Sequence, residues 1–243
     1  MKKFETIKES GDSEKINDFL IDLGRDPKKE YLKILDFFIE KRDPDIFNKI
    51  KLNLIFILGE LGGLIEIDKK YIEFLIEEYF ISDRWIRNEI VCAFNKIGNK
   101  MQFPRKVLDI LKYAIIDDYL PIAINGMKSL LHFENLSDDL FENLFKTLKV
   151  QDSELIDQIF KVINKFIINE AVLFEKLITL DNYRNLDKKS IRSLLILFFN
   201  SVIRLHNLKS FRELVENSEW ENKDKEKFLA EIDVYEKLLL KRI

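Results

Sequence analysis

Residues 83–98 read DRWIRNEIVCAFNKIG, and this stretch decides the fold. Its apolar side chains recur at spacings of four, four and three residues, at Ile86, Ile90, Phe94 and Ile97. That spacing places them on one face of an α-helix. An aspartate precedes the stripe and a glycine follows it, as is typical of residues that cap the two ends of a helix. The stretch therefore predicts an amphipathic helix with one buried face.

The same apolar stripe recurs along the chain at a nearly constant interval. Steps of 36, 36, 33 and 36 residues lead from one stripe to the next, and the stripes begin at Ile50, Ile86, Ile122, Leu155 and Ile191. A second apolar helix falls before each stripe, and its buried face is expected to include Leu35, Tyr71, Val107, Leu140 and Leu173 in turn. This repetition predicts units of two helices, an outer A helix and an inner B helix.

Prolines and glycines fall near the expected helix boundaries. Asp26-Pro27 and Asp43-Pro44 each place a capping carboxylate before a proline, so each pair predicts a helix start. Gly62-Gly63 predicts the end of an inner helix. No linker rich in proline or serine separates two domains, so the sequence predicts one continuous domain.

The composition excludes several classes of fold and partner. With 7 Gly and 4 Pro in 243 residues, the chain lacks the turn residues that β-sandwiches and propellers need. Its 40 basic and 43 acidic residues are spread evenly, which argues against nucleic acid or a membrane surface as the partner. The single Cys92 and the absence of a long apolar segment favour a cytoplasmic location.

The stretch 83–98 resembles the inner helix of a HEAT repeat. The HEAT pattern is matched by Asp83, Ile86-Arg87, Ala93 and Ile97-Gly98, and the resemblance covers roughly residues 26–206. It implies an all-α, right-handed α-solenoid of about five to six helix pairs. On this reading 1–243 is a single domain in which 14–24 is a partial repeat, 26–206 the core and 207–243 the C-terminal capping helices. Residues 1–12 are expected to lack regular structure.

The resemblance implies a non-enzymatic scaffold that binds a protein or peptide along the concave face of its inner helices. One alternative is a HEAT-like alkylpurine DNA glycosylase, because Trp85 beside Asp83 is similar to the tryptophan and aspartate of those enzymes. The even charge argues against that alternative, and we expect Trp85 to pack at a repeat junction. A relative of the HEAT-like tetrapyrrole lyases is the third possibility considered.

A helical projection identifies the side chains opposite the core stripe on each inner helix. We call them the predicted partner-binding set: Leu52, Phe56, Arg84, Asn88, Asn95, Leu120, Ile124, Lys128, Leu131, Lys161, Asn164, Leu197 and Asn200. Three asparagines in the set, Asn95, Asn164 and Asn200, occupy the same position in successive repeats. An amide side chain both donates and accepts hydrogen bonds, so this row is suited to binding a peptide backbone. The apolar members predict a surface that a partner covers.

The sequence offers little for catalysis. The two histidines are far apart, and Cys92 has no adjacent group that would lower its pKa. Acidic pairs such as Asp117-Asp118 are interpreted as carboxylates at helix ends. We therefore expect no catalytic residue, no metal site and no cofactor.

Overall fold

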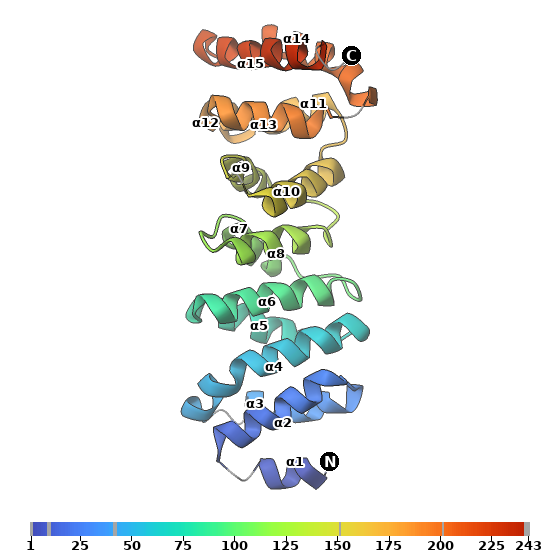
Figure 1. The fold of residues 1–243 in the computed structure, drawn as a ribbon, viewed down its shortest axis with the longest axis vertical. Coiled ribbons are helices and arrows are strands. Elements are labelled where there is room, and N and C mark those ends of the chain that lie inside the picture. The colour runs from blue at the N-terminus through green and yellow to red at the C-terminus, as the bar shows by residue number, and fades with distance from the viewer. Residues whose placement is uncertain (1, 9–10, 41–42, 151, 201, 241–243) are drawn as a thin grey trace. The chain divides into compact units, whose positions relative to one another are not determined.

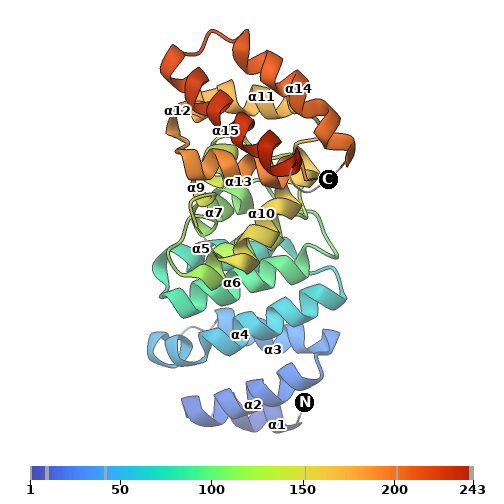
Figure 2. The same ribbon diagram turned by 45° about the horizontal axis from the view of Figure 1, so that its top comes forward.

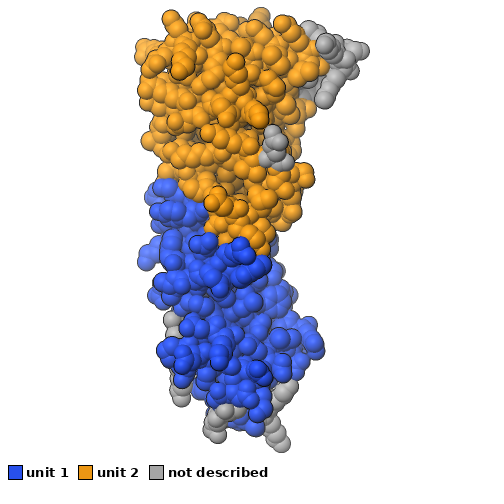
Figure 3. Space-filling view, turned by 60° about the vertical axis from the view of Figure 1, so that its left-hand side comes forward, with its two compact units in different colours: residues 1–114 blue, residues 115–243 orange. Residues whose placement is uncertain are grey.

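The computed structural model describes residues 2–8, 11–40, 43–150, 152–200 and 202–240, and every regular element in these ranges is a helix (Figure 1 and Figure 2). This confirms the all-α class that the apolar periodicity predicts. The chain divides into two compact units, residues 1–114 and residues 115–243, which Figure 3 distinguishes by colour.

The first unit is a set of helices that pack in chain order. Its elements are α1 (Lys2–Ile7), α2 (Ser13–Arg25), the short 3-10 helix η1 (Lys29–Tyr31), α3 (Leu32–Glu40), α4 (Pro44–Leu64), α5 (Lys69–Ile81), α6 (Arg84–Ile97) and α7 (Lys106–Ala114). Helix α4 lies between α2 and α6 and packs against both (Figure 1). The intervening helices pair with this row, α3 with α4 and α5 with α6.

The second unit repeats this arrangement with different helices. It contains α8 (Leu120–Leu130), α9 (Asp138–Thr147), α10 (Ser153–Phe166), α11 (Glu170–Ile178), η2 (Thr179–Asp181), α12 (Asn182–Asn185), α13 (Lys188–Phe198), α14 (Val202–Glu216) and α15 (Asn222–Leu240). Helix α10 packs against α8 and α13, and α13 packs against α15. Helices α11 and α14 pack against each other (Figure 2).

The predicted apolar stripes form the cores of both units. The residues that begin the five stripes are all at most 8% exposed: Ile50, Ile86, Ile122, Leu155 and Ile191. The residues predicted for the intervening helices are also buried: Leu35, Tyr71, Val107, Leu140 and Leu173. Burial of apolar area is the main favourable term in folding, so the periodicity correctly predicts which face of each helix turns inward.

Two predicted helix starts have different outcomes. Helix α4 begins at Pro44, and the Asp43 carboxylate accepts hydrogen bonds from the backbone N–H groups of Asp45 and Ile46 at 3.0 and 3.1 Å. The prediction at Asp26-Pro27 is wrong. The backbone at Lys28 is extended (φ −127°, ψ 143°), and the next helix starts only at Lys29.

The prediction that a helix ends at Gly62-Gly63 is confirmed to within one residue, because the last residue of α4 is Leu64. The glycines are needed here for space. A Cβ atom on Gly59 would lie 3.0 Å from the Ala93 Cβ atom, and one on Gly62 would lie 2.3 Å from the Ile97 Cγ1 atom. Both contacts face α6, so the glycines allow α4 and α6 to approach closely.

The N-terminal residues differ from the expectation as well. Residues Lys2–Ile7, expected to lack regular structure, form α1. The physical reason is Phe4, which is 7% exposed and whose ring packs within 6.3 Å of the rings of Phe19, Phe37 and Phe38, measured between centroids. An aromatic side chain that buries its surface in this way anchors a short helix.

Candidate functional site

Phe56 is a member of the predicted partner-binding set that contacts two neighbouring helices in the first unit. Its side chain is 36% exposed on α4, and that of Leu52, one turn earlier, is 41% exposed. A Cβ atom on Gly24 of α2 would lie 2.9 Å from Phe56 Cε1, so the ring lies directly on the α2 backbone. The Lys96 ammonium of α6 lies 4.9 Å from the ring centroid. Phe56 of α4 therefore contacts both α2 and α6, while one side of it faces solvent.

Charged groups lie beside this ring. Lys96 Nζ is 2.6 Å from Glu60 Oε1 of α4. Glu89, half-buried on α6, has a raised pKa because burial disfavours its charged form, while Lys96 lowers the pKa and Glu60 raises it. The surface around Phe56 thus combines an aromatic ring with the Lys96–Glu60 ion pair, and the half-buried Glu89 interacts electrostatically with both members of that pair.

The predicted residues on α6 lie in three different environments. Arg84 is exposed, and its guanidinium carbon is 5.0 Å from the centroid of the Trp85 ring. Asn88 and Asn95 are half-buried, and both interact with neighbouring groups. Trp85 itself is 54% exposed, so the expectation that it packs at a repeat junction is wrong. It precedes Ile86, the first buried residue of the stripe, and so lies on the solvent side of the helix.

Asp83, which the sequence pairs with Trp85, acts as a helix cap. Its Oδ1 atom accepts hydrogen bonds from the backbone N–H groups of Trp85 and Ile86 at 2.9 and 3.0 Å. A carboxylate in this position stabilises the start of α6.

The second unit contains both exposed and buried members of the predicted set. Leu120 is 36% exposed, whereas Ile124 and Leu197 are 8% and 9% exposed and do not present their side chains to solvent. Leu131 is half-buried. The lysines form ion pairs within the unit: Lys128 lies 3.1 Å from Glu154, and Lys161 lies 2.8 Å from Asp157.

The asparagines that share a repeat position differ in how their amides are used. Asn164 donates through Nδ2 to the carbonyl oxygen of Phe160 in its own helix at 2.8 Å, so this donor is engaged. Asn200 is exposed, and Asn95 is half-buried. The three asparagines occupy the same position in the repeat, but they differ in exposure and in hydrogen bonding.

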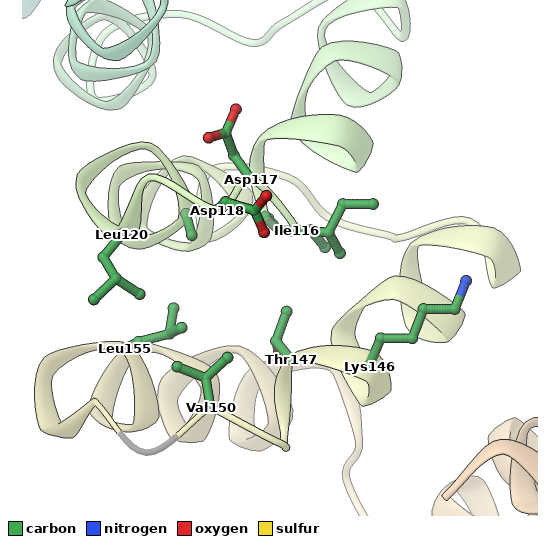
Figure 4. A pocket seen from close by; sticks show the side chains of 10 residues that line it. Ile116, Asp117, Asp118, Leu120, Lys146, Thr147, Val150 and Leu155 are labelled. Carbon is green, nitrogen blue, oxygen red and sulfur yellow. The ribbon is translucent and has the colours of Figure 1, made fainter. Parts of the chain in front are cut away.

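A pocket of about 400 Å³ lies in the second unit, beside the N-terminal ends of α8 and α10. We call it the α8–α10 pocket, and Figure 4 shows the side chains that line it. They come from the residues before α8, the first turn of α8, the end of α9, the connection from α9 to α10, and the start of α10: Ile115, Ile116, Asp117, Asp118, Leu120, Ala123, Lys146, Thr147, Val150 and Leu155. Six of the ten are apolar, and Leu120 also belongs to the predicted partner-binding set.

Most polar groups of the α8–α10 pocket already have intramolecular partners. Asp117 Oδ1 accepts a hydrogen bond from the Tyr119 N–H at 2.9 Å. Lys146 is paired with Glu142 at 2.7 Å, and the Thr147 hydroxyl donates to the Leu144 carbonyl at 2.6 Å. Asp118 is exposed, and no hydrogen bond or ion pair joins it to another residue in the described part of the chain.

The prediction that Asp117-Asp118 lies at a helix end is correct for Asp117, which accepts a hydrogen bond in the turn before α8. The sequence did not predict that Asp118 lines a cavity. The adjacent acidic residues were the only signal, because the cavity depends on how α9 and α10 pack against the residues before α8.

Exposed aromatic residues near the start of α6 were also missed. Phe80, Trp85 and Tyr113 are 59%, 54% and 55% exposed, and Ile81 is 74% exposed. The rings of Phe80 and Tyr113 meet edge to face, with centroids 5.8 Å apart. The repeat pattern gave no reason to expect these side chains at the surface.

Among the described residues, no three His, Cys, Asp or Glu side chains come together in a group that could hold a metal ion. No helix there has both the length and the apolar character needed to cross a membrane.

No protein-family model matches the chain, and no curated protein matches its sequence.

Proposed function

We propose that this chain is a non-enzymatic binding module for a protein or peptide, built as a right-handed, HEAT-like α-solenoid. Contacts between residues about one repeat apart support the architecture. Hydrogen bonds connect the side chains of Asn17 and Asn53, and those of Glu60 and Lys96. A third runs from the Tyr235 hydroxyl to the Phe199 backbone carbonyl, and the two residues of each pair are 36 positions apart. Such regular nearest-neighbour contacts are typical of stacked helix pairs.

The observation that carries the function is the apolar surface shared by α2 and α4. Leu52 and Phe56 are exposed on α4, and Ile21 is 45% exposed on α2. Ile21 lies one helical turn before Gly24, the residue against which the Phe56 ring packs. Apolar side chains that are exposed next to one another mark an interaction site more often than isolated ones do, so we assign this surface to the partner.

The polar groups beside the apolar surface suit a protein partner. Lys96 and Glu60 lie next to Phe56 and offer both charge signs at the edge of the ring. An apolar centre with a mixed polar rim is the usual anatomy of a protein–protein interface. The capping role of Asp83 also favours this function over the DNA-glycosylase alternative, because one of its carboxylate oxygens already accepts two backbone N–H groups.

The proposal is tested with a displayed library of random 12-residue peptides selected on the whole chain. Enriched peptides are synthesised, and their affinities are measured by fluorescence anisotropy for the wild type, the Leu52→Ser/Phe56→Ser double variant and the Leu64→Ser control. Leu64 is 58% exposed in the same helix but lies about 80–120° around it from the other two. Circular dichroism establishes that all three proteins fold.

We expect the double variant to bind at least tenfold more weakly, since two buried apolar contacts at an interface contribute more than about 1.4 kcal/mol together. The control should bind like the wild type. A selection that enriches no peptide, or equal affinities for the three folded proteins, would contradict the proposal. DNA binding at about 50 mM salt, where electrostatic attraction is strong, would instead support the nucleic-acid alternative.

A further inference from the structure

The α8–α10 pocket combines an apolar interior with the Asp118 carboxylate, to which no hydrogen bond or ion pair is made by the residues that the structure describes. The interior is formed by Ile115, Ala123 and Leu155, which are at most 2% exposed, together with the more accessible Ile116, Leu120 and Val150. Its volume of about 400 Å³ lies at the small end of the range for ligand sites. This volume holds an aliphatic side chain together with the adjoining part of the segment that carries it.

The charges around the opening favour a cation over an anion. Lys146 forms an ion pair with Glu142, and Asp117 accepts a hydrogen bond within the turn before α8. Asp152 is likewise engaged, because its Oδ1 atom accepts the Leu155 N–H at 2.9 Å and caps α10. Asp118 remains without an ion pair among the described residues. In the view of Figure 4 its side chain points into the space above Val150 and Leu155, whereas Asp117 points away from it.

We propose that the α8–α10 pocket receives an aliphatic side chain of a bound protein segment, and that a lysine or arginine of the same segment pairs with Asp118. The inference rests on the proposed function and adds a specificity to it. The apolar interior supplies the favourable burial of the aliphatic group. The carboxylate at the opening selects segments in which a basic residue adjoins that group, and it disfavours acidic segments.

The pocket is tested with capped dipeptides that vary one property at a time. Acetyl-Leu-Lys-amide is compared with acetyl-Ala-Lys-amide, which lacks the aliphatic group, and with acetyl-Leu-Glu-amide, which reverses the charge. Binding to the full chain is followed by NMR titration of assigned Ile, Leu and Val methyl groups. The pocket methyls of Ile115, Leu120 and Leu155 should shift, whereas those of Leu52 report on the α2–α4 surface.

We expect acetyl-Leu-Lys-amide to bind about tenfold more tightly than the alanine analogue. It should bind at least fivefold more tightly than the glutamate analogue, because one close ion pair in a solvated position amounts to about that factor. Asp118→Lys should weaken acetyl-Leu-Lys-amide by at least fivefold. Glu134→Lys makes the same charge change at an exposed position of the same unit that does not line the pocket, and it should have no such effect.

Several results would overturn the inference. Equal binding of the three dipeptides, absence of shifts at the pocket methyls, or an equal effect of Asp118→Lys and Glu134→Lys would each do so. Tighter binding of 4-methylpentylamine than of acetyl-Leu-Lys-amide would assign the pocket to a small amine instead of a protein segment. If the selected 12-residue peptides lose affinity in the Leu52→Ser/Phe56→Ser variant but not in Asp118→Lys, the pocket inference fails while the proposed function stands.

Discussion

Gly62 of α4 lies so close to Ile97 of α6 that a Cβ atom at position 62 would stand 2.3 Å from the Ile97 Cγ1 atom. Ile97 is fully buried, so it has no free space into which it can move. We predict that Gly62→Ala destabilises the protein by about 1–3 kcal/mol, the usual cost of overfilling a packed core. Urea unfolding followed by circular dichroism measures the change.

Gly63→Ala is the matched control. A Cβ atom there would be 3.4 Å from the Lys96 Cβ atom, an ordinary van der Waals contact. Because alanine favours the helix over glycine, this variant should be more stable by about 0.5–1 kcal/mol. Equal effects of the two substitutions would show that helix propensity, and not the approach of α4 to α6, governs these positions.

The buried ion pair between α4 and α5 gives a second prediction. Lys51 Nζ lies 3.1 Å from Glu78 Oε2 and 3.0 Å from the Ser82 hydroxyl, and the two charged side chains are 9% and 2% exposed. Glu78→Ala leaves the ammonium buried without its counter-charge, so we expect a loss of about 3–5 kcal/mol. Thermal and urea unfolding should both detect it.

The Lys51→Met/Glu78→Met double variant separates pairing from packing. It removes both charges together, so its stability should return to within about 1 kcal/mol of the wild type or exceed it. A double variant as unstable as the Glu78→Ala single variant would mean that the ion pair itself holds α4 against α5.

A third prediction concerns the left-handed turn between α11 and α12. Leu180 (φ 55°, ψ 24°) and Asp181 (φ 52°, ψ 34°) both adopt the region that favours glycine, and Leu180 is 55% exposed. Left-handed backbone costs an L-residue about 1–2 kcal/mol, and little packing holds this side chain. Leu180→Gly should therefore stabilise the chain by about 1 kcal/mol in urea unfolding.

Leu238→Gly is the control for this turn. Leu238 is 47% exposed within the regular helix α15, where glycine should cost about 1 kcal/mol. The two substitutions should thus change stability in opposite directions. A loss of stability in both would contradict backbone strain at Leu180.

A fourth prediction follows from the half-buried Glu89. Its pKa is raised in the folded protein, chiefly by burial, so the folded state holds this proton at pH values where the unfolded state has released it. The stabilisation is complete below the unfolded pKa of Glu and is lost as pH rises through the folded pKa. Glu89→Gln replaces the ionisable group with a neutral one, so the variant should not lose stability in this way as the pH rises.

The measurement is the free energy of unfolding of the wild type and Glu89→Gln across pH 4 to 7. We expect the variant to gain stability relative to the wild type as pH rises, with the difference established by pH 7. Glu73→Gln, an exposed carboxylate on α5, is the control and should follow the wild type at every pH. A constant difference between Glu89→Gln and the wild type would show that ionisation is not the cause.

The buried faces were predictable because they depend on local periodicity alone. Ile86 and Ile90 follow a helical spacing, and burial of apolar surface then decides which side of α6 turns inward. The close packing of Gly62 against α6 was not predictable in the same way. Gly62 looks like a terminator in sequence, and only the neighbouring helix shows that it provides space for Ile97.

The candidate site was predictable only in part, for a similar reason. The helical projection placed Leu52, Phe56 and Leu120 on an open face, and all three are at least 36% exposed. It placed Ile124 and Leu197 there too, although tertiary neighbours bury both. A projection of one helix contains no information about the helices beside it, so it finds a face but not which parts are covered.

Contact between Phe56 and its neighbours has a consequence for dynamics. The ring touches Gly24 of α2 and lies under the Lys96 ammonium of α6, so a molecule that rests on it restrains three helices at once. Local opening of any one of them would then require that molecule to leave. Occupation of this small area should accordingly slow amide hydrogen exchange along α2, α4 and α6, far beyond the residues that are touched.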